Sequence, residues 1–367
     1  MQLTDEQRAL RDAVRALLDH HQRRSPDNDR GGHDQGYDPV LWRRLCGEIG
    51  VAGLAVPECY GGAGAGPVET HIAAEELGRG LTPTPMLGSA VLAAQAVLAS
   101  GDAAAARRLL PGIADGTTIA ALAWTGLDGH WDPGQAACHA AAAAGGWRLD
   151  GEAHHVLDGD AADVLLVAAR VPDGTGLFEV DPRQSGITRS AATAMDGTRR
   201  LAIVGLKDVA GVRIGDRPVL ARARDLACIA LSAEQVGAAR RALDLTVAYT
   251  QVRVQFGRAI ASFQALQHRM ADLHVLVESA RSLSYAAASA AAEGAPDLGL
   301  RAAAAKVYCS EAALRVAGEM IQLHGAIGIT WEHDAHRYLK RAHGAAQLFG
   351  QPSEHVARIA AVLIDRQ

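Results

Sequence analysis

Apolar residues recur at helical spacing through the first third of the chain. Leu10, Val14 and Leu17 fall on one face of a helix with 3.6 residues per turn. Thr4 precedes this stripe, and Gln7 follows Thr4 in the pattern of a capping box at a helix start. The sequence therefore predicts an N-terminal α-helical domain over residues 1–118. Its further predicted helices lie near 39–49, 68–77, 88–100 and 103–114.

From residue 119 the pattern changes to short apolar runs separated by Gly, Asp and Pro. Short runs bounded by turn residues predict β-strands. The alanine- and glycine-rich stretch 132–146 shows no core-forming pattern, and we interpret it as a surface connection of low complexity. A β-domain is thus expected over residues 119–221. Its predicted strands are Ile119–Trp124, Trp147–Asp150, Val164–Val171 and Leu201–Val204.

Long helical stripes return after residue 222. Val236, Ala239, Leu243 and Val247 form one of them, and similar stripes follow near 266–280 and 307–321. Long stripes joined by short loops are typical of an antiparallel helix bundle. The predicted fold class is therefore α+β. It has an N-terminal helical domain, a small β-barrel or sandwich domain, and a four-helix bundle over residues 222–367.

Composition narrows the functional class. Of the 367 residues, 49% are hydrophobic and 21% charged, and the net charge is −5 without blocks of like charge. That balance is typical of a globular protein and does not favour nucleic-acid binding. The five cysteines are scattered without CxxC spacing, which favours a reducing compartment and buried thiols. No signal peptide and no membrane-spanning apolar run are recognised, so we expect a cytoplasmic protein with no membrane partner.

The stretch Arg253–Gln264 carries the strongest indication of chemistry. Arg253 and Arg258 lie five apart on a predicted helix that leads into Gly257, together with Gln255 and Phe256. Arginine side chains suit a phosphate or pyrophosphate, and an aromatic ring can lie against a flat heterocycle. The alternative is an exposed basic helix end with a buried phenylalanine. A second glycine-containing segment, Gln322–Gly328, reads either as a helix C-cap or as a close approach to a ligand.

These segments make the chain resemble the acyl-CoA dehydrogenases. Residues 244–272 are similar to the family's helix and RxQFG segment, and Gln322–Gly328 is similar to its QxxGGxG segment. Asp38–Gly66 resembles the family's N-terminal domain, so the likeness covers nearly the whole chain. It implies FAD as cofactor, with its ADP half bound across a subunit boundary. The matching residues are Arg253, Gln255, Phe256, Phe263, Gln264, Gln322 and Gly325, and Ala326 departs from the family's second glycine.

The resemblance also implies a reaction and its partners. The reaction is α,β-desaturation of an acyl-CoA thioester, in which a carboxylate removes the α-proton and hydride leaves for the flavin. Electrons then pass to an electron-transferring flavoprotein. At the family's two alternative base positions this chain has Phe349 and Ala227, neither of which accepts a proton. Asp225 and Glu234 are weak replacement candidates, and each also reads as an ordinary helix charge.

The β-domain departs from the family as well. The segment beginning at Trp124 stands where the family has a flavin-contacting TEP-type segment, and Leu157 replaces a hydroxyl of its WIT-type segment. This combination resembles the actinobacterial acyl-CoA dehydrogenases built from two homologous subunits, several of which act on steroid side-chain thioesters. It implies a hetero-oligomer, expected to be a tetramer, with the base on the partner. The alternatives are a non-redox enzyme that reuses the fold and a catalytically silent structural subunit.

A histidine cluster offers one further possibility. His333, His336 and His343 lie close to Glu332 and Asp334 in the sequence, and His-x-x-His on a helix can bind a metal. We interpret these residues instead as polar positions at a subunit contact and predict no metal site.

Overall fold

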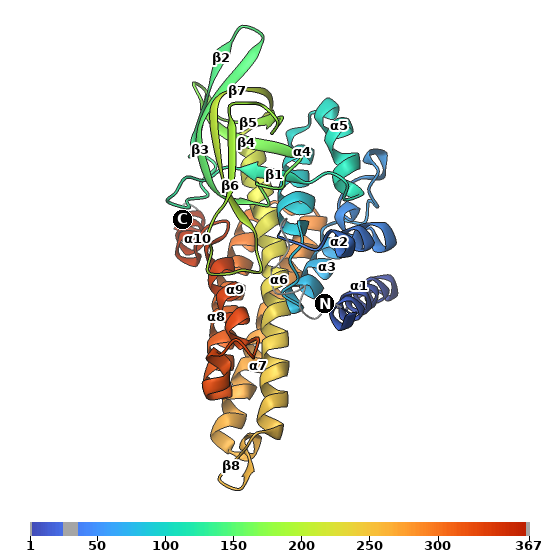
Figure 1. The fold of residues 1–367 in the computed structure, drawn as a ribbon, viewed down its shortest axis with the longest axis vertical. Coiled ribbons are helices and arrows are strands. Elements are labelled where there is room, and N and C mark those ends of the chain that lie inside the picture. The colour runs from blue at the N-terminus through green and yellow to red at the C-terminus, as the bar shows by residue number, and fades with distance from the viewer. Residues whose placement is uncertain (1, 25–35, 365–367) are drawn as a thin grey trace.

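The computed structural model describes residues 2–24 and 36–364 and has three parts (Figure 1). The predicted order of helical domain, β-domain and helix bundle is confirmed. In the N-terminal part, Thr4 and Gln7 exchange backbone–side-chain hydrogen bonds of 3.1 and 3.2 Å at the start of the first helix. The N-terminal helices are α1 (Asp5–Arg24), α2 (Pro39–Arg44), η2 (Leu45–Ile49), η3 (Val51–Gly53), η4 (Glu58–Tyr60), α3 (Pro67–Arg79), η5 (Met86–Ala93), α4 (Ala94–Ser100) and α5 (Ala103–Ala114).

The middle part is a closed β-barrel. Hydrogen-bonded pairs run β4–β2–β3–β7–β5, and β5 pairs with β4 to close the circle, while β1 and β6 attach to β4 and β7. Closure leaves few unpaired strand edges. The strands are β1 (Ala120–Ala123), β2 (Cys138–Ala143), β3 (Gly146–Leu157), β4 (Val164–Val171), β5 (Gly174–Val180), β6 (Ile187–Ala191) and β7 (Leu201–Asp216).

One strand corrects the interpretation of 132–146 as an irregular surface connection. Residues Cys138–Ala143 form β2, which pairs antiparallel with β3 and parallel with β4. Cys138 and Ala140 are buried, whereas His139 and Ala141 are exposed. The sequence hides this alternation because alanine occupies both faces, so the period-two signal of a half-buried strand is missing.

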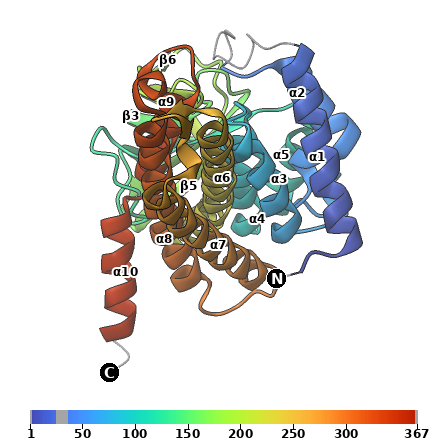
Figure 2. The same cartoon turned by 90° about the horizontal axis from the view of Figure 1, so that it is seen from below.

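The C-terminal part is a bundle of long helices beside the N-terminal helices. Figure 1 shows α6, α7 and α8 running side by side, and Figure 2 shows α1 and α10 on opposite sides of the bundle. The elements are α6 (Arg217–Val252), β8 (Val254–Gln255), β9 (Arg258–Ala259), η6 (Ile260–Ser262), α7 (Gln264–Ala292), α8 (Leu298–His324), η7 (Gly325–Ile329), α9 (Ala335–Gln347) and α10 (Pro352–Ile364).

Two glycines allow α3 and α6 to cross closely. A Cβ atom at Gly237 would lie 1.9 Å from the carbonyl oxygen of Glu75, and one at Gly78 would lie 2.2 Å from that of Glu234. Neither backbone oxygen can move without displacing its helix. The crossing therefore fixes the N-terminal domain against the bundle and fixes Glu234 in place.

A buried ionic network attaches the barrel to the bundle. Arg341 of α9 lies 3.0 Å from a carboxylate oxygen of Asp196 and donates a 2.7 Å hydrogen bond to the carbonyl oxygen of Thr198. Both partners belong to the connection between β6 and β7. Arg341 also lies 3.3 Å from Glu234 of α6, which pairs in addition with Arg199. The four charged side chains are nearly excluded from water, so their charges are screened little.

Asp158, directly after β3, lies beside this network. Burial raises the pKa of its carboxyl to about 7, and the neighbouring Arg199 opposes the rise. Its backbone is also in the left-handed region, with φ of 56°. A buried carboxyl held in this way is half-neutral near pH 7.

Four of the five cysteines are buried and one is exposed. Cys46, Cys138, Cys228 and Cys309 are buried, and burial raises the pKa of each thiol to about 12. Cys59 is exposed, contrary to the expectation that all five are buried.

None of the helices within the described residues is long and apolar enough to cross a membrane.

We expect Gly237→Ala to destabilise the protein, because the added methyl group overlaps the Glu75 carbonyl oxygen. Overpacking of this kind costs about 1–3 kcal/mol or more. The matched control is Gly318→Ala in α8, where a Cβ atom meets nothing within 4 Å; it should gain about 0.5–1 kcal/mol from helix propensity. Denaturant unfolding measures both, and equal stabilities for the two variants would contradict the close crossing.

Asp158 should make stability depend on pH. The folded protein keeps a proton on Asp158 that the unfolded chain releases above its ordinary pKa of 3.8. The free energy of unfolding should therefore fall as pH rises from about 4 to about 7, by at most about 1.4 kcal/mol per pH unit. Asp158→Asn should remove this decline. Urea unfolding at several pH values tests it, and parallel curves for the two proteins would refute it.

Candidate flavin-binding and catalytic positions

The RxQFG-like stretch forms the far tip of the bundle. The prediction that it lies on a helix is wrong, because α6 ends at Val252 and the chain continues into a short β-hairpin. Strands β8 and β9 pair Val254 with Ala259 and Gln255 with Arg258, which leaves Phe256 and Gly257 as a two-residue turn. Both turn residues have positive φ, 54° and 75°. That geometry is the type I′ turn, which glycine adopts freely and phenylalanine adopts at a steric cost. The turn thus holds the Phe256 ring outward, 91% exposed.

The polar side chains of this tip have few partners of their own. Within the described part of the chain, the Arg253 guanidinium makes no ion pair or hydrogen bond. The Arg258 guanidinium carbon lies 4.0 Å from the ring centre of Phe263, a cation–π contact that leaves its N–H groups free. Phe263 in turn meets Phe256 edge-on, with ring centres 6.0 Å apart. Two arginines and an aromatic pair are thus presented to solvent, the groups suited to a phosphate-bearing aromatic ligand.

The second predicted segment lies at the same end of the bundle. Tyr249, near the end of α6, stacks on His324 at the end of α8 with ring centres 4.4 Å apart. Its hydroxyl donates a 3.3 Å hydrogen bond to the His324 carbonyl oxygen. Gly325 ends α8 with φ of 63°, so it serves as a C-cap. The structure therefore brings Arg253 and Gln322 to one end of the molecule.

Tyr249 and His324 are structural residues of this end that the sequence analysis does not identify. They lie far apart in the chain, and no local spacing connects them. The remaining predicted residues are on the surface here: the side chains of Gln255, Gln264 and Gln322 are exposed, as is Ala326. The methyl group of Ala326 therefore faces outward and does not disturb the packing of the chain itself.

Large apolar side chains surround these polar groups. The most exposed, besides Phe256, are Val252, Ile329 and Trp331, each between 73% and 80% exposed. We call them, together with Phe256, the apolar tip. Several large exposed apolar side chains at one end of a molecule are typical of a contact with another molecule.

The two family base positions meet near the opposite end of α6. The Sγ atom of Cys228, the residue after Ala227, lies 3.9 Å from the Phe349 carbonyl oxygen. Ala227 and Phe349 are both fully buried. Phe349 meets Trp131 edge-on at 5.0 Å, and Trp131 meets Trp124 at 5.6 Å. This aromatic cluster of Trp124, Trp131 and Phe349 occupies the place where a base is expected.

A cavity of about 410 Å³ borders the aromatic cluster from outside. Trp131 and Phe349 form its inner wall, and its rim is basic. The rim side chains come from the starts of α6 and α10, namely Arg217, Arg224, Glu354, His355 and Arg358.

The two replacement base candidates are held by arginines. Asp225 accepts two hydrogen bonds from Arg358 of α10, of 2.6 and 2.8 Å. Glu234 belongs to the ionic network with Arg199 and Arg341. Both carboxylates are therefore engaged in ion pairs, an arrangement typical of a structural contact rather than of a base that accepts a proton from substrate.

The barrel positions that face a flavin ring elsewhere in the family are closed. Leu157 is buried in the core, and a Cβ atom at Gly88 would lie 2.9 Å from the Leu157 Cβ. The Thr125 hydroxyl donates a 2.9 Å hydrogen bond to the His154 carbonyl oxygen and is equally buried. The tip therefore offers groups whose chemistry suits FAD, whereas at these barrel positions Leu157 is buried and the Thr125 hydroxyl is already bonded within the chain.

The tip and the base positions are far apart within one chain. Arg253 and Ala227 lie on the same helix, about 40 Å apart at 1.5 Å per residue. Figure 1 shows the same separation, with β8 at the lower end and the barrel at the upper end. One copy of the chain therefore cannot bring its tip to its own base positions.

The chain matches two family models. That of the acyl-CoA dehydrogenase N-terminal domain matches residues 4–117, and that of the acyl-CoA dehydrogenase C-terminal domain matches residues 220–364. Among characterised sequences, it is 40% identical to acyl-CoA dehydrogenase IpdE2 of Mycolicibacterium smegmatis over 361 residues, 98% of this chain and 99% of that protein. It is 39% identical to IpdE2 of Mycobacterium tuberculosis over 355 residues, 97% and 96% of the two chains.

Solved structures show the same likeness. The Tcur3481-Tcur3483 steroid ACAD is 32% identical with a TM-score of 0.90, and 98% of each chain is covered. The ChsE4-ChsE5 complex from Mycobacterium tuberculosis is 29% identical with a TM-score of 0.89, covering 99% of this chain and 98% of that one. Both family models and 40% identity along almost its whole length show that this chain belongs to the acyl-CoA dehydrogenase family.

Proposed function

We propose that this chain is one subunit of an FAD-dependent acyl-CoA dehydrogenase whose catalytic base lies on a different, homologous subunit. The observation that carries the proposal is the contrast between the two ends of α6. Among the described residues, the tip presents two arginines without an anionic partner beside exposed rings, whereas the base positions hold buried Phe349 and Ala227. The chain thus keeps the groups that reach another subunit's cofactor and lacks those that act on its own.

At the tip, each group has a stated task in this proposal. Arg253 and Arg258 bind the phosphates of the ADP half of FAD, because guanidinium groups pair well with phosphate oxygens. Phe256 lies against the adenine, and Gln322 hydrogen-bonds to the same half of the cofactor. FAD, when bound, supplies the hydride acceptor. The apolar tip excludes water from this contact once the partner covers it.

Two structural relatives support the heteromeric arrangement. The ChsE4-ChsE5 structure is a complex of two chains, and the Tcur3481-Tcur3483 structure is called a steroid ACAD. By this likeness, we propose that the substrate is a steroid-derived acyl-CoA thioester and that the assembly is a tetramer of two kinds of subunit. An electron-transferring flavoprotein as acceptor and a cytoplasmic location belong to the same proposal.

A purely structural subunit is the main competing function. It is favoured by the same closed core, since the aromatic cluster leaves this chain no base. The two functions differ at the tip, because a structural subunit needs the apolar contact but not the free arginines.

The heteromeric proposal is tested by purifying the chain alone and co-purified with a homologous subunit that has a glutamate at a base position. We expect the lone chain to carry little flavin and to desaturate no acyl-CoA. The complex should carry FAD, seen by its visible absorbance, and reduce an artificial electron acceptor with acyl-CoA. Full flavin content and dehydrogenase activity in the lone chain would refute the proposal. A colourless complex would favour a non-redox enzyme.

Arg253→Gln should lower the FAD content and activity of the complex. Losing a charge-assisted hydrogen bond to phosphate costs about 1.5–3 kcal/mol, so FAD affinity should fall at least tenfold. Folding should be unaffected, because Arg253 is exposed. The matched control is Arg107→Gln on α5, an equally exposed arginine remote from the tip. FAD affinity is measured by fluorescence titration of the deflavinated complex. An unchanged affinity with Arg253→Gln would favour the structural subunit.

A further inference from the structure

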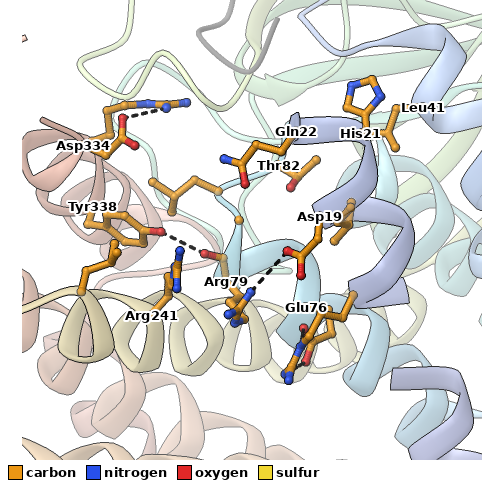
Figure 3. A pocket seen from close by; sticks show the side chains of 16 residues that line it. Asp19, His21, Gln22, Leu41, Glu76, Arg79, Thr82, Arg241, Asp334 and Tyr338 are labelled. Carbon is orange, nitrogen blue, oxygen red and sulfur yellow. Dashed lines mark hydrogen bonds and ion pairs between the residues drawn. The ribbon is translucent and has the colours of Figure 1, made fainter. Parts of the chain in front are cut away.

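A second polar pocket lies between the N-terminal helices and the bundle, apart from the tip and from the base positions. It has a volume of about 100 Å³, well above the roughly 10–15 Å³ that one water molecule needs. Its charged side chains come from α1 and the end of α3 on one side and from α6 and the start of α9 on the other, and Leu41 of α2 also lines it (Figure 3). We call it the α1–α9 pocket.

The pocket contains four arginines and three carboxylates, and three of the arginines have acidic partners. Arg15 binds Glu76 through two hydrogen bonds of 2.8 and 2.6 Å. Arg79 lies 3.8 Å from Asp19, a long ion pair. Arg337 lies 3.1 Å from Asp334. These pairs balance each other's charge and leave one cation over.

That cation is Arg241. Within the described residues its guanidinium makes no ion pair and no hydrogen bond, although it is only partly exposed. Figure 3 shows it rising from α6 between Tyr338 and Arg79. Tyr338 does not supply the missing anion. Its hydroxyl donates a 3.0 Å hydrogen bond to the Arg79 carbonyl oxygen, and burial raises its pKa to about 12.

We propose that the α1–α9 pocket binds a small oxyanion of the phosphate class, held by Arg241 with help from Arg79. A guanidinium fork pairs best with carboxylate or phosphate oxygens. Here Arg79, Arg241 and Arg337 approach from three different helices, so a tetrahedral group with oxygens in several directions suits the site better than a planar carboxylate. The shared chemistry is that of free phosphate or of the phosphoryl end of a larger molecule.

Binding at this place ties two parts of the molecule together. Arg79 ends α3 of the N-terminal domain, whereas Arg241 belongs to α6 of the bundle. An anion between them adds a contact across the domain junction and stabilises the folded protein in proportion to its occupancy. The site is independent of the tip and of the proposed dehydrogenase function.

The test is calorimetric titration of the full chain with inorganic phosphate, at constant ionic strength set by chloride. We expect one phosphate per chain, and an affinity at least about tenfold weaker for Arg241→Gln, since a charged hydrogen-bond partner is lost. The matched control is Arg240→Gln on the next position of α6. Arg240 pairs with Asp244 and with Glu278 of α7 and does not line the pocket. This control should bind phosphate like the original chain.

No saturable phosphate binding, or equal binding by the original chain and Arg241→Gln, would overturn the proposal. Thermal unfolding with and without phosphate provides a second readout. The unfolding temperature should rise with phosphate in the original chain and in Arg240→Gln but not in Arg241→Gln; an equal rise in all three would be a general salt effect and would count against the site. A titration with glycerol phosphate distinguishes the sources. Tighter binding than phosphate supports the phosphoryl end of a larger ligand, and weaker binding supports the free ion.

Discussion

The close crossing of α3 and α6 is the constraint on which the other contacts depend. Two glycines let the helix backbones touch where any side chain would force them apart. The same stretch of α6 carries Glu234, which contacts the β6–β7 connection, and Arg241, which lines the pocket beside α1. How closely α3 and α6 approach therefore sets how far Glu234 lies from the barrel and Arg241 from α1. The ionic network around Arg341 then joins the third part of the molecule to this frame. A change at the crossing is thus transmitted to the barrel and to the α1–α9 pocket together.

The long helix α6 divides the molecule functionally. At one end Trp131 packs edge-on against both Trp124 and Phe349, and the nearby carboxylates are bonded to arginines. The other end presents exposed charged and apolar groups to solvent, and the guanidinium groups there have no anionic partner among the described residues. A single subunit that ran the whole reaction would need a proton-accepting side chain at the first end, where this chain has Phe349 and Ala227. In this chain a packed aromatic cluster occupies the first end, and the side chains available to bind another molecule lie at the second end.

The sequence predicts the helices and the order of the three parts well, because capping residues and apolar stripes are local signals. Thr4 and Gln7 form the capping box that their spacing predicts. The strand β2 is missed because alanine on both faces removes the alternation. The resemblance to a family pointed to Arg253 and Gln322, and the structure adds that they lie at one end of the bundle, a relation no spacing gives. Likewise, Asp225 and Glu234 look available in the sequence, and only the fold shows the arginines of α9, α10 and the β6–β7 connection that occupy them. Arg241 could not be singled out from sequence, since what distinguishes it is that no described residue forms an ion pair or hydrogen bond with its guanidinium.

The apolar tip also has a consequence for the relative amounts in which this chain and its partner are synthesised. Phe256, Ile329 and Trp331 are held outward by the turn and by the end of α8, so they do not fold back to hide from water. A subunit synthesised without its partner exposes this apolar surface until it assembles. Two such subunits can self-associate through it. Under the heteromeric proposal, the two chains therefore have to be made in matched amounts, and the surplus of this one is what proteases and chaperones would encounter first.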